Sequence, residues 1–353
     1  MAVPYHAFVI ALVGCSLGLW LGIPLASRIG LVDRPGGRKQ HRSVTPLVGG
    51  AAMFVGAVPG LLSISEPMPH LTRFLLVVTI IMIVGVWDDL VGLRVRYRFL
   101  TEFAVALAIT LYGGVAVRTL GDLLGFGVVN LHEWASLFTM LCVVGVVNAF
   151  NMTDGLDGLA AGLSLVSFVL LTGLAWGAGR MGEAFGLGVL VAVLLPFFGV
   201  NSRLFGRSQA ATFMGDAGSK FLGFTLAWFT IALSQGENPA FAPVTALWLI
   251  ALPLIDMFSS IVRRLAWKRP PFGPDLDHLH HLLWRRGWGV NAIVLGMMAI
   301  SLAFGLVGII LPLLGVPDFL MFFGILGIFG LYCRWGLRRW GGRTGLPAGG
   351  VSG

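Results

Sequence analysis

Long apolar runs separated by short polar segments are the main pattern along this chain of 353 residues. A helix needs about 20 consecutive apolar residues to cross the hydrocarbon layer of a membrane, where its backbone must be hydrogen-bonded internally. The runs therefore predict an all-α polytopic membrane protein with about eleven transmembrane helices. They cover residues 6–27, 47–65, 71–87, 99–117, 134–150, 158–176, 184–201, 217–234, 242–262, 289–313 and 319–333.

The composition agrees with a single membrane domain. With 57% hydrophobic and 11% charged residues and a mean hydropathy of +0.88, the chain cannot form a soluble globule. No polar segment between the runs has the size of a domain, so we expect one integral-membrane domain over residues 1–333 and a basic, Gly-rich cytoplasmic tail over residues 334–353. The first run has no basic segment before it, which favours a retained helix over a cleavable signal.

The cations fall mostly on one side of the predicted membrane. Of the 24 Lys and Arg residues, 21 lie on one side of the predicted membrane, in every second polar segment between or after the apolar runs or, for Lys220, at the edge of a run. The other three are Arg73, Arg118 and Arg180. The positive-inside rule makes the side with more cations cytoplasmic, with the N-terminus periplasmic and the C-terminus cytoplasmic. The net charge of +8 then reflects topology and anionic membrane lipid, and no nucleic acid partner is expected.

The aspartates gather on the same cytoplasmic side, whereas Glu66, Glu133, Glu183 and Glu237 lie on the other. Topology explains the cations but does not explain this asymmetry of the acids. Ionisable side chains at membrane depth are costly, so a functional site is the default interpretation. Carboxylates collected at one face indicate a bound cation, and a cation indicates phosphate chemistry. The aspartates concerned are Asp33, Asp88, Asp89, Asp154, Asp157, Asp216, Asp256, Asp275 and Asp277.

Two of the acidic segments carry paired carboxylates. Asp88 and Asp89 follow an apolar run directly; they repel one another, so one should titrate high unless a metal or an arginine neutralises the pair. Such a pair can bind Mg²⁺ or supply a general base, and the alternative is a solvated helix cap.

Asp154 and Asp157 would share a face if their segment is helical, and Asn151 continues the same three-residue spacing.

Two other cytoplasmic loops carry candidate binding residues. The start of a predicted helix around Asp216 has small residues whose N–H groups suit a phosphate, with the aspartate suited to its metal. Phe213, isolated among small polar residues, either stacks on a base or anchors the loop in lipid. The basic loop with Arg38, Lys39 and His41 can fold over a polyanion, although an ordinary positive-inside loop has the same composition.

The last candidate residues along the chain are a histidine cluster, His278, His280 and His281, in a further cytoplasmic loop. Zinc is disfavoured, because neither cysteine partners nor an HExxH spacing accompanies these histidines. Imidazoles that hydrogen-bond phosphate or sugar oxygens fit the surrounding acids better. Three other classes of protein fit less well. A transporter should show acids at the midplane and an internal repeat, whereas here the acids lie at one face and no repeat is seen. An intramembrane aspartyl protease should show Gly-x-Gly-Asp, of which Phe213-Met-Gly-Asp216 lacks the first glycine, and a non-catalytic scaffold needs no acid cluster.

Together these motifs resemble the polyprenyl-phosphate N-acetylhexosamine-1-phosphate transferases, glycosyltransferase family 4. The resemblance spans residues 33–285. The family includes the phospho-N-acetylmuramoyl-pentapeptide transferases and the undecaprenyl-phosphate N-acetylglucosamine-1-phosphate transferases. The motifs, in order, are Asp33-x-Pro with Arg38-Lys39-x-His41 and Gly49-Gly50, then Asp88-Asp89, Asn148 to Ala160, Phe213-Met-Gly-Asp216-Ala-Gly-Ser219, Pro253-x-x-Asp256 and Asp277-His278-Leu-His280-His281.

The resemblance implies Mg²⁺-dependent transfer, with Mn²⁺ as a substitute, of a sugar 1-phosphate from a UDP-sugar donor to undecaprenyl phosphate, with release of UMP. Such an enzyme lies in the bacterial inner membrane and starts a lipid-linked cell-envelope glycan such as O-antigen. By the family pattern, Asp216 is the chief metal ligand with Asp88 beside it, and Asp88, Asp89 and Asp157 are the catalytic residues. The substrate-binding set is Arg38, Lys39, His41, Asn151, Asp154, Phe213, His278, His280 and His281, with Asn151, Asp154 and Phe213 at the uracil.

The interrupted order His278-Leu-His280-His281 is more like the N-acetylglucosamine branch than the muramoyl-pentapeptide branch, which tends to carry three consecutive histidines. Other 2-acetamido sugars stay open as donors. The sequence also leaves open the oligomeric state, with a homodimer as one option, and the choice between direct transfer and a covalent intermediate.

Overall fold

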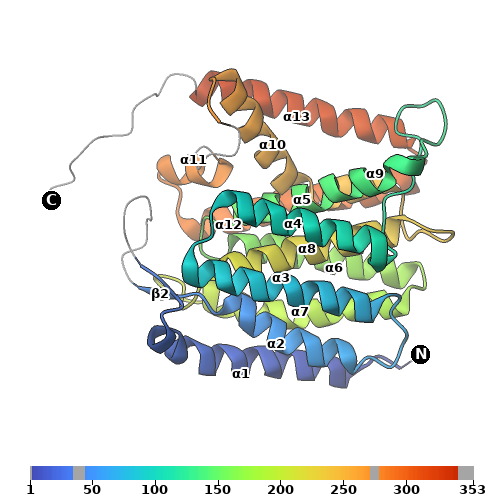
Figure 1. Cartoon of the computed structure of the whole chain (residues 1–353). Helices are drawn as coiled ribbons and strands as arrows, with labels where there is room; N and C mark the ends of the chain where they lie inside the picture. The colour runs from blue at the N-terminus through green and yellow to red at the C-terminus, as the bar shows by residue number, and fades with distance from the viewer. Residues whose placement is uncertain (1, 35–43, 271–277, 341–353) are drawn as a thin grey trace.

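The computed structural model describes residues 2–34, 44–270 and 278–340, and these residues form a bundle of helices with one small sheet (Figure 1). Arg38, Lys39, His41, Asp275 and Asp277 lie outside the described residues. The helices are α1 Tyr5–Ile29, α2 Gly49–Leu62, α3 Leu71–Val91, α4 Val95–Ala108, α5 Ala135–Thr153, α6 Leu159–Gly177, α7 Met181–Asn201, α8 Gly215–Ser234, α9 Pro243–Leu249, α10 Ala251–Ala266, α11 Leu279–Arg285, α12 Val290–Leu313 and α13 Asp318–Trp340.

Among the described residues, seven helices are long and apolar enough to cross a membrane, and α9 with α10, bent by 80°, would make an eighth. Each predicted run falls on a helix or on consecutive helices, which confirms the all-α polytopic class. The number of about eleven spans stays a prediction, because α2 and α4 have only 14 residues each and α8 carries Asp216 and Lys220. Helix α13 continues past the predicted tail boundary at residue 333 to Trp340.

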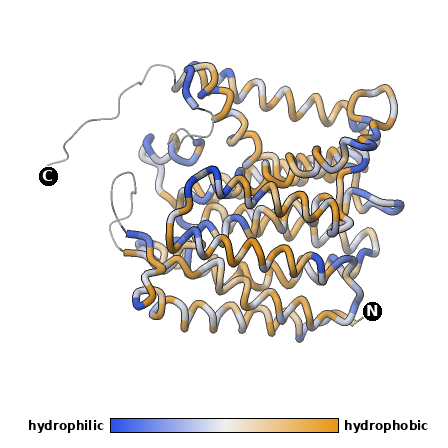
Figure 2. The backbone as a smooth tube through the Cα atoms, in the orientation of Figure 1, coloured by the Kyte–Doolittle hydropathy of each residue, from blue (hydrophilic) through white to orange (hydrophobic). Residues whose placement is uncertain are grey.

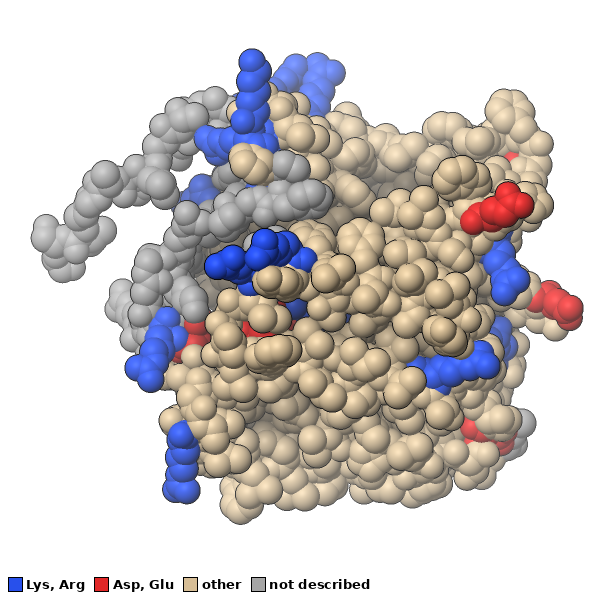
Figure 3. Space-filling model, viewed as in Figure 1, with Lys and Arg blue, Asp and Glu red and all other residues tan. Residues whose placement is uncertain are grey.

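The charged residues lie at the two ends of the bundle. Apolar positions dominate the middle of the helices in Figure 2, and in Figure 3 a band without Lys, Arg, Asp or Glu separates the charged ends. Exposed apolar side chains such as Trp20, Leu76 and Leu331 lie on the outer faces of α1, α3 and α13. This distribution is the one expected of a protein surrounded by lipid at its middle and by water at both ends.

Helix α8 lies at the centre of the bundle, and nearly all of its residues are buried. Its first turns pack against α3 at very short range: a Cβ atom added to Gly85 would come within 2.4 Å of the Ala217 Cα atom. Only glycine allows this approach without a shift of the backbone. Because Asp88 and Asp89 follow Gly85 by one helical turn, the approach brings both carboxylates to the start of α8.

A short antiparallel sheet lies beside the start of α8. Strands β1 Val32–Asp33 and β2 Thr45–Pro46 pair with Val32 opposite Pro46. The chain before α8 extends this arrangement, because the Phe213 N–H donates to the Pro46 carbonyl at 2.9 Å and the Gly49 N–H donates to the Phe213 carbonyl at 3.0 Å. These bonds fix the backbone of Phe213 next to the start of α2.

Candidate active site

A cavity of about 890 Å³ opens at the end of the bundle that carries β1, β2 and α11. The predicted site aspartates Asp88, Asp89, Asp154, Asp157 and Asp216 all line it, although they come from three separate segments of the chain. The structure therefore brings together these five of the aspartates that the sequence assigned to one site; Asp33 lines the cavity as well, whereas Asp256 does not. Other lining residues used below are Arg98, Gly155, Arg203, Ala210, Phe213 and His281.

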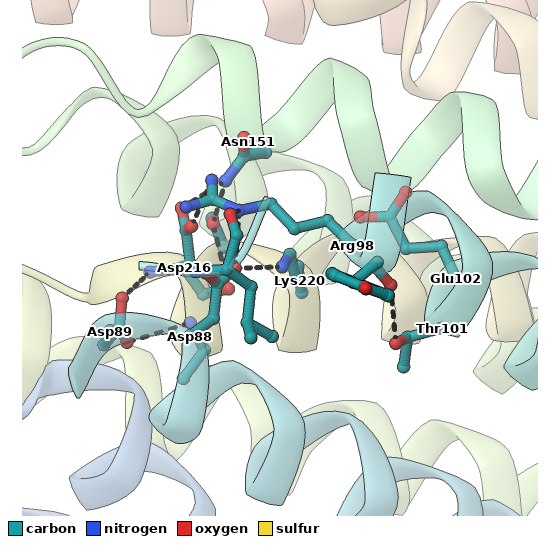
Figure 4. Close-up of polar contacts among 12 residues, drawn as sticks. Asp88, Asp89, Arg98, Thr101, Glu102, Asn151, Asp216 and Lys220 are labelled. Carbon is teal, nitrogen blue, oxygen red and sulfur yellow. Dashed lines mark hydrogen bonds and ion pairs between the residues drawn. The ribbon is translucent and has the colours of Figure 1, made fainter. Parts of the chain in front are cut away.

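Asp216, in the first turn of α8, lies at the centre of a polar network (Figure 4). Its Oδ1 atom accepts a hydrogen bond from Asn151 Nδ2 at 3.0 Å, and its Oδ2 atom pairs with Arg98 Nη1 at 2.7 Å. Asn151 also donates to Ser219 Oγ at 2.8 Å. The predicted uracil ligand Asn151 thus orients Asp216 in this structure, and its contact with uracil stays a prediction.

Asp88 is buried, with 2% of its surface exposed. Its Oδ2 atom lies 2.9 Å from both Lys220 Nζ and Arg98 Nε, and its Oδ1 atom accepts the Leu93 N–H at 2.9 Å. Arg98 therefore bridges Asp88 and Asp216, as Figure 4 shows. The predicted roles of Asp88 as catalytic residue and second metal ligand stay predictions, and the structure shows its carboxylate engaged by two cations.

Asp89 caps α8 from the neighbouring helix. Its Oδ1 atom accepts the Asp216 N–H at 2.7 Å and its Oδ2 atom accepts the Ala217 N–H at 3.2 Å. A carboxylate is stabilised here by the otherwise unpaired N–H groups and by the helix dipole. The expectation that the N–H groups at this helix start face a phosphate is therefore wrong for these two, because the carboxylate of α3 already fills the position.

Asp154 and Asp157 lie in the turn between α5 and α6, after α5 has ended at Thr153. Asp157 accepts hydrogen bonds from Arg203 Nε at 2.6 Å and from the Ala210 N–H at 3.1 Å. Burial of the carboxyl raises the pKa of Asp154 to about 8, and repulsion from Asp216, Asp157 and Asp89 adds to the shift. The expected shared helix face is not formed, yet both carboxyls line the cavity.

The three histidines have different surroundings. His278 is buried, and its Nδ1 atom lies 2.8 Å from Asp256 Oδ2. His280 is fully buried and stacks parallel to His278, with the ring centroids 5.8 Å apart. Of the three, His281 lines the cavity. Their predicted contacts with the donor stay predictions, and the geometry favours His281 for direct contact.

The cavity offers the oxygen donors that Mg²⁺ prefers, among which Asp216 keeps 24% of its side chain exposed. Within the described ranges, no three His, Cys, Asp or Glu side chains lie close enough to hold a metal ion by themselves. Mg²⁺ usually takes one or two carboxylates and fills its other positions with water and phosphate oxygens. The residues therefore fit a Mg²⁺ ion that is shared with a phosphate ligand.

Sequence reasoning did not assign roles to Lys220, Arg98 and Arg203. Lys220 lies in an apolar run, and an ionisable residue in such a run is itself a signal of a site. Arg98 and Arg203 lie in basic segments that the positive-inside rule alone explains. Glu102, which accepts a hydrogen bond from Asn148 Nδ2 at 2.6 Å beside this network, belongs to none of the sequence motifs.

Comparisons with known proteins identify relatives over most of the chain. Residues 71–234, which carry five of the six aspartates that line the cavity, match the family model of glycosyl transferase family 4; the sixth is Asp33. An undecaprenyl-phosphate alpha-N-acetylglucosaminyl 1-phosphate transferase from Yersinia pestis is 37% identical over 89% of this chain and 86% of its own length. Proteins of the same name from Escherichia coli K12 and Haemophilus influenzae are 35% and 34% identical, over 81% and 94% of this chain and 78% and 95% of their own lengths.

Proposed function

Because the chain belongs to glycosyl transferase family 4, we propose that it transfers N-acetylglucosamine 1-phosphate from a UDP-sugar to undecaprenyl phosphate and releases UMP. The chain is accordingly a membrane phosphotransferase. The observation that carries the proposal is the cavity in which Asp88, Asp89, Asp154, Asp157 and Asp216 meet, within a chain that is 34–37% identical to transferases of that name.

The arrangement suits phosphoryl transfer between two anionic substrates. Such a reaction is catalysed mainly by positioning and by neutralising the charge on phosphate oxygens. Arg98 and Arg203 supply fixed positive charge at the cavity wall, and Lys220 forms an ion pair with Asp88. Asp216, with Asp88 beside it, would hold Mg²⁺, which would neutralise further charge on the donor's pyrophosphate.

We also propose the topology that the cations predict, with the cavity on the cytoplasmic side of the bacterial inner membrane. Helix α1 ends with Arg28 just before β1, which lines the cavity, and α10 and α11 carry Arg263, Arg264 and Arg285 in their last turns. Cytoplasmic ends of membrane helices are enriched in such cations. This orientation leaves the N-terminus periplasmic and the end of α13 cytoplasmic.

A donor comparison tests the proposed function. Purified protein with undecaprenyl phosphate and Mg²⁺ should release UMP from UDP-N-acetylglucosamine faster than from UDP-N-acetylgalactosamine or UDP-N-acetylmuramoyl-pentapeptide. Release from the pentapeptide donor alone would move the chain to the peptidoglycan branch. Release from none of the three, with the protein shown to be folded, would refute the proposal.

Phe213 provides a separate test of donor binding. We propose that its ring, which lines the cavity, stacks on uracil. Phe213→Ala should then weaken UDP-sugar binding by about 1–3 kcal/mol, the scale of stacking between a base and an aromatic ring, whereas Phe213→Trp should keep most of the affinity. Titration calorimetry measures both constants. Phe205→Ala is the matched control, since Phe205 is exposed and packs on Phe198. An unchanged dissociation constant for Phe213→Ala would make the residue a lipid anchor.

A further inference from the structure

One buried carboxylate joins three helices beside the cavity. Asp256 belongs to α10 and has 4% of its surface exposed. Its Oδ1 atom accepts hydrogen bonds from the Tyr332 hydroxyl of α13 at 2.7 Å and from the Leu279 N–H at the start of α11 at 3.0 Å. Its Oδ2 atom lies 2.8 Å from His278 Nδ1. None of these side chains lines the cavity, so their role in the reaction, if they have one, must be indirect.

The contacts continue from this carboxylate to the cavity wall. His278 stacks on His280. The centroid of the His280 ring lies 4.2 Å from that of His281, and His281 does line the cavity. His280 also packs against the turn that carries Asp154 and Asp157, because a Cβ atom added to Gly155 would come within 2.3 Å of its Nε2 atom. The first turn of α11 is thus held between Asp256 on one side and the aspartate turn on the other.

Helix α13 contributes to this arrangement through Tyr332. It runs beside α10 at the edge of the bundle (Figure 1), and it lies outside the part of the chain that matches the family model. The Tyr332 hydroxyl fixes one carboxylate oxygen of Asp256, which leaves the other oriented toward the His278 ring. A carboxylate held in this way determines both the direction of the imidazole and the position of the adjacent backbone N–H.

We propose that Tyr332 and Asp256 are positioning residues, which hold the first turn of α11 so that His281 faces the UDP-sugar donor in the cavity. The proposal rests on the proposed function for its substrate, and on the contacts above for its geometry. Small displacements of a group that contacts the reacting atoms reduce turnover by up to about a hundredfold, whereas ground-state binding through other contacts changes less. Loss of the Tyr332 contact should therefore lower kcat more than it raises the donor's KM.

The kinetic experiment compares Tyr332→Phe and Asp256→Asn with wild type, alone and combined with His281→Ala. We expect kcat to fall about tenfold in Tyr332→Phe and up to about a hundredfold in Asp256→Asn, with donor KM within about threefold. In the His281→Ala background, Tyr332→Phe should cost less than twofold, because groups that act through one another are not additive. Tyr112→Phe, which changes an exposed tyrosine of the segment Ile109–Gly113, is the matched control.

Hydrogen exchange of residues 278–285 gives a readout that needs no substrate. Tyr332→Phe and Asp256→Asn should speed exchange there, and Tyr112→Phe should not. Faster exchange in a protein that releases no UMP from any donor would support the positioning role while the proposed function fails. Unchanged exchange in both variants would overturn the proposal. A full additional tenfold loss in the His281→Ala background would also overturn it, because Tyr332 would then act independently of His281.

Discussion

Asp216→Asn should lower metal-dependent UMP release by at least about a hundredfold, because removal of one charge-stabilising group from a site of this kind commonly has that effect. The change keeps the shape of the side chain and an oxygen that can accept from Asn151, so the variant should stay folded. EDTA should abolish wild-type activity, and Mg²⁺ or Mn²⁺ should restore it, because carboxylate oxygens favour these ions. The assay is UMP release from protein in detergent, with metal binding measured separately by calorimetry.

Asp122→Asn is the matched control for this experiment. Asp122 accepts the Gly127 N–H in the loop over residues 114–131, outside the cavity, and asparagine can accept the same hydrogen bond. The control variant should keep both activity and metal affinity. Full activity of the wild type in EDTA, or wild-type turnover by Asp216→Asn, would exclude the metal role assigned to Asp216.

Lys220→Met should destabilise the folded protein by about 3 kcal/mol, the lower end of the usual effect of removing one partner of a buried ion pair, because Arg98 still pairs with Asp88. Lys220 is buried in α8 and its Nζ atom lies 2.9 Å from Asp88 Oδ2, whose side chain is fully buried. The double variant Asp88→Asn with Lys220→Met should be less destabilised than the sum of the single variants, with a coupling energy of about 1–3 kcal/mol. Unfolding of all four proteins in detergent measures this cycle.

Lys268→Met, at an exposed position after α10, serves as the control and should leave stability unchanged. Strict additivity of the two buried substitutions would show that Lys220 and Asp88 do not stabilise one another. Turnover of Asp88→Asn, measured in the same preparations, separates structure from chemistry. Near wild-type turnover in Asp88→Asn would remove this residue from the catalytic set, whereas loss of turnover in a folded variant would keep it there.

The helices of this protein could be predicted from the sequence because hydropathy is a local property. Each apolar run became a helix or consecutive helices, and the cavity aspartates could be recognised as charges at the ends of such runs. The 80° bend between α9 and α10 could not be predicted in this way, because the run over residues 242–262 is apolar on both sides of the break.

The partners of the site residues could not be predicted, because they depend on the register between distant helices. Asp88 and Lys220 are 132 positions apart, and their contact requires the approach of Gly85 to Ala217. The position of Asp89 over the start of α8 follows from the same register. For the histidines, a spacing of residues cannot distinguish a ring that stacks inside the protein, such as His280, from one that faces the cavity, such as His281.

The adjacent carboxylates of α3 hold α8 at two heights. Asp89 holds the N–H groups of Asp216 and Ala217, and Asp88 holds the side chain of Lys220 one helical turn further along. Helix α8 can therefore neither slide along its axis nor rotate about it without breaking one of these two contacts, so α3 and α8 form one rigid wall of the cavity. Asp216, in the first turn of α8, is then held at a constant height relative to the carboxylates of α3, whatever substrate enters the cavity.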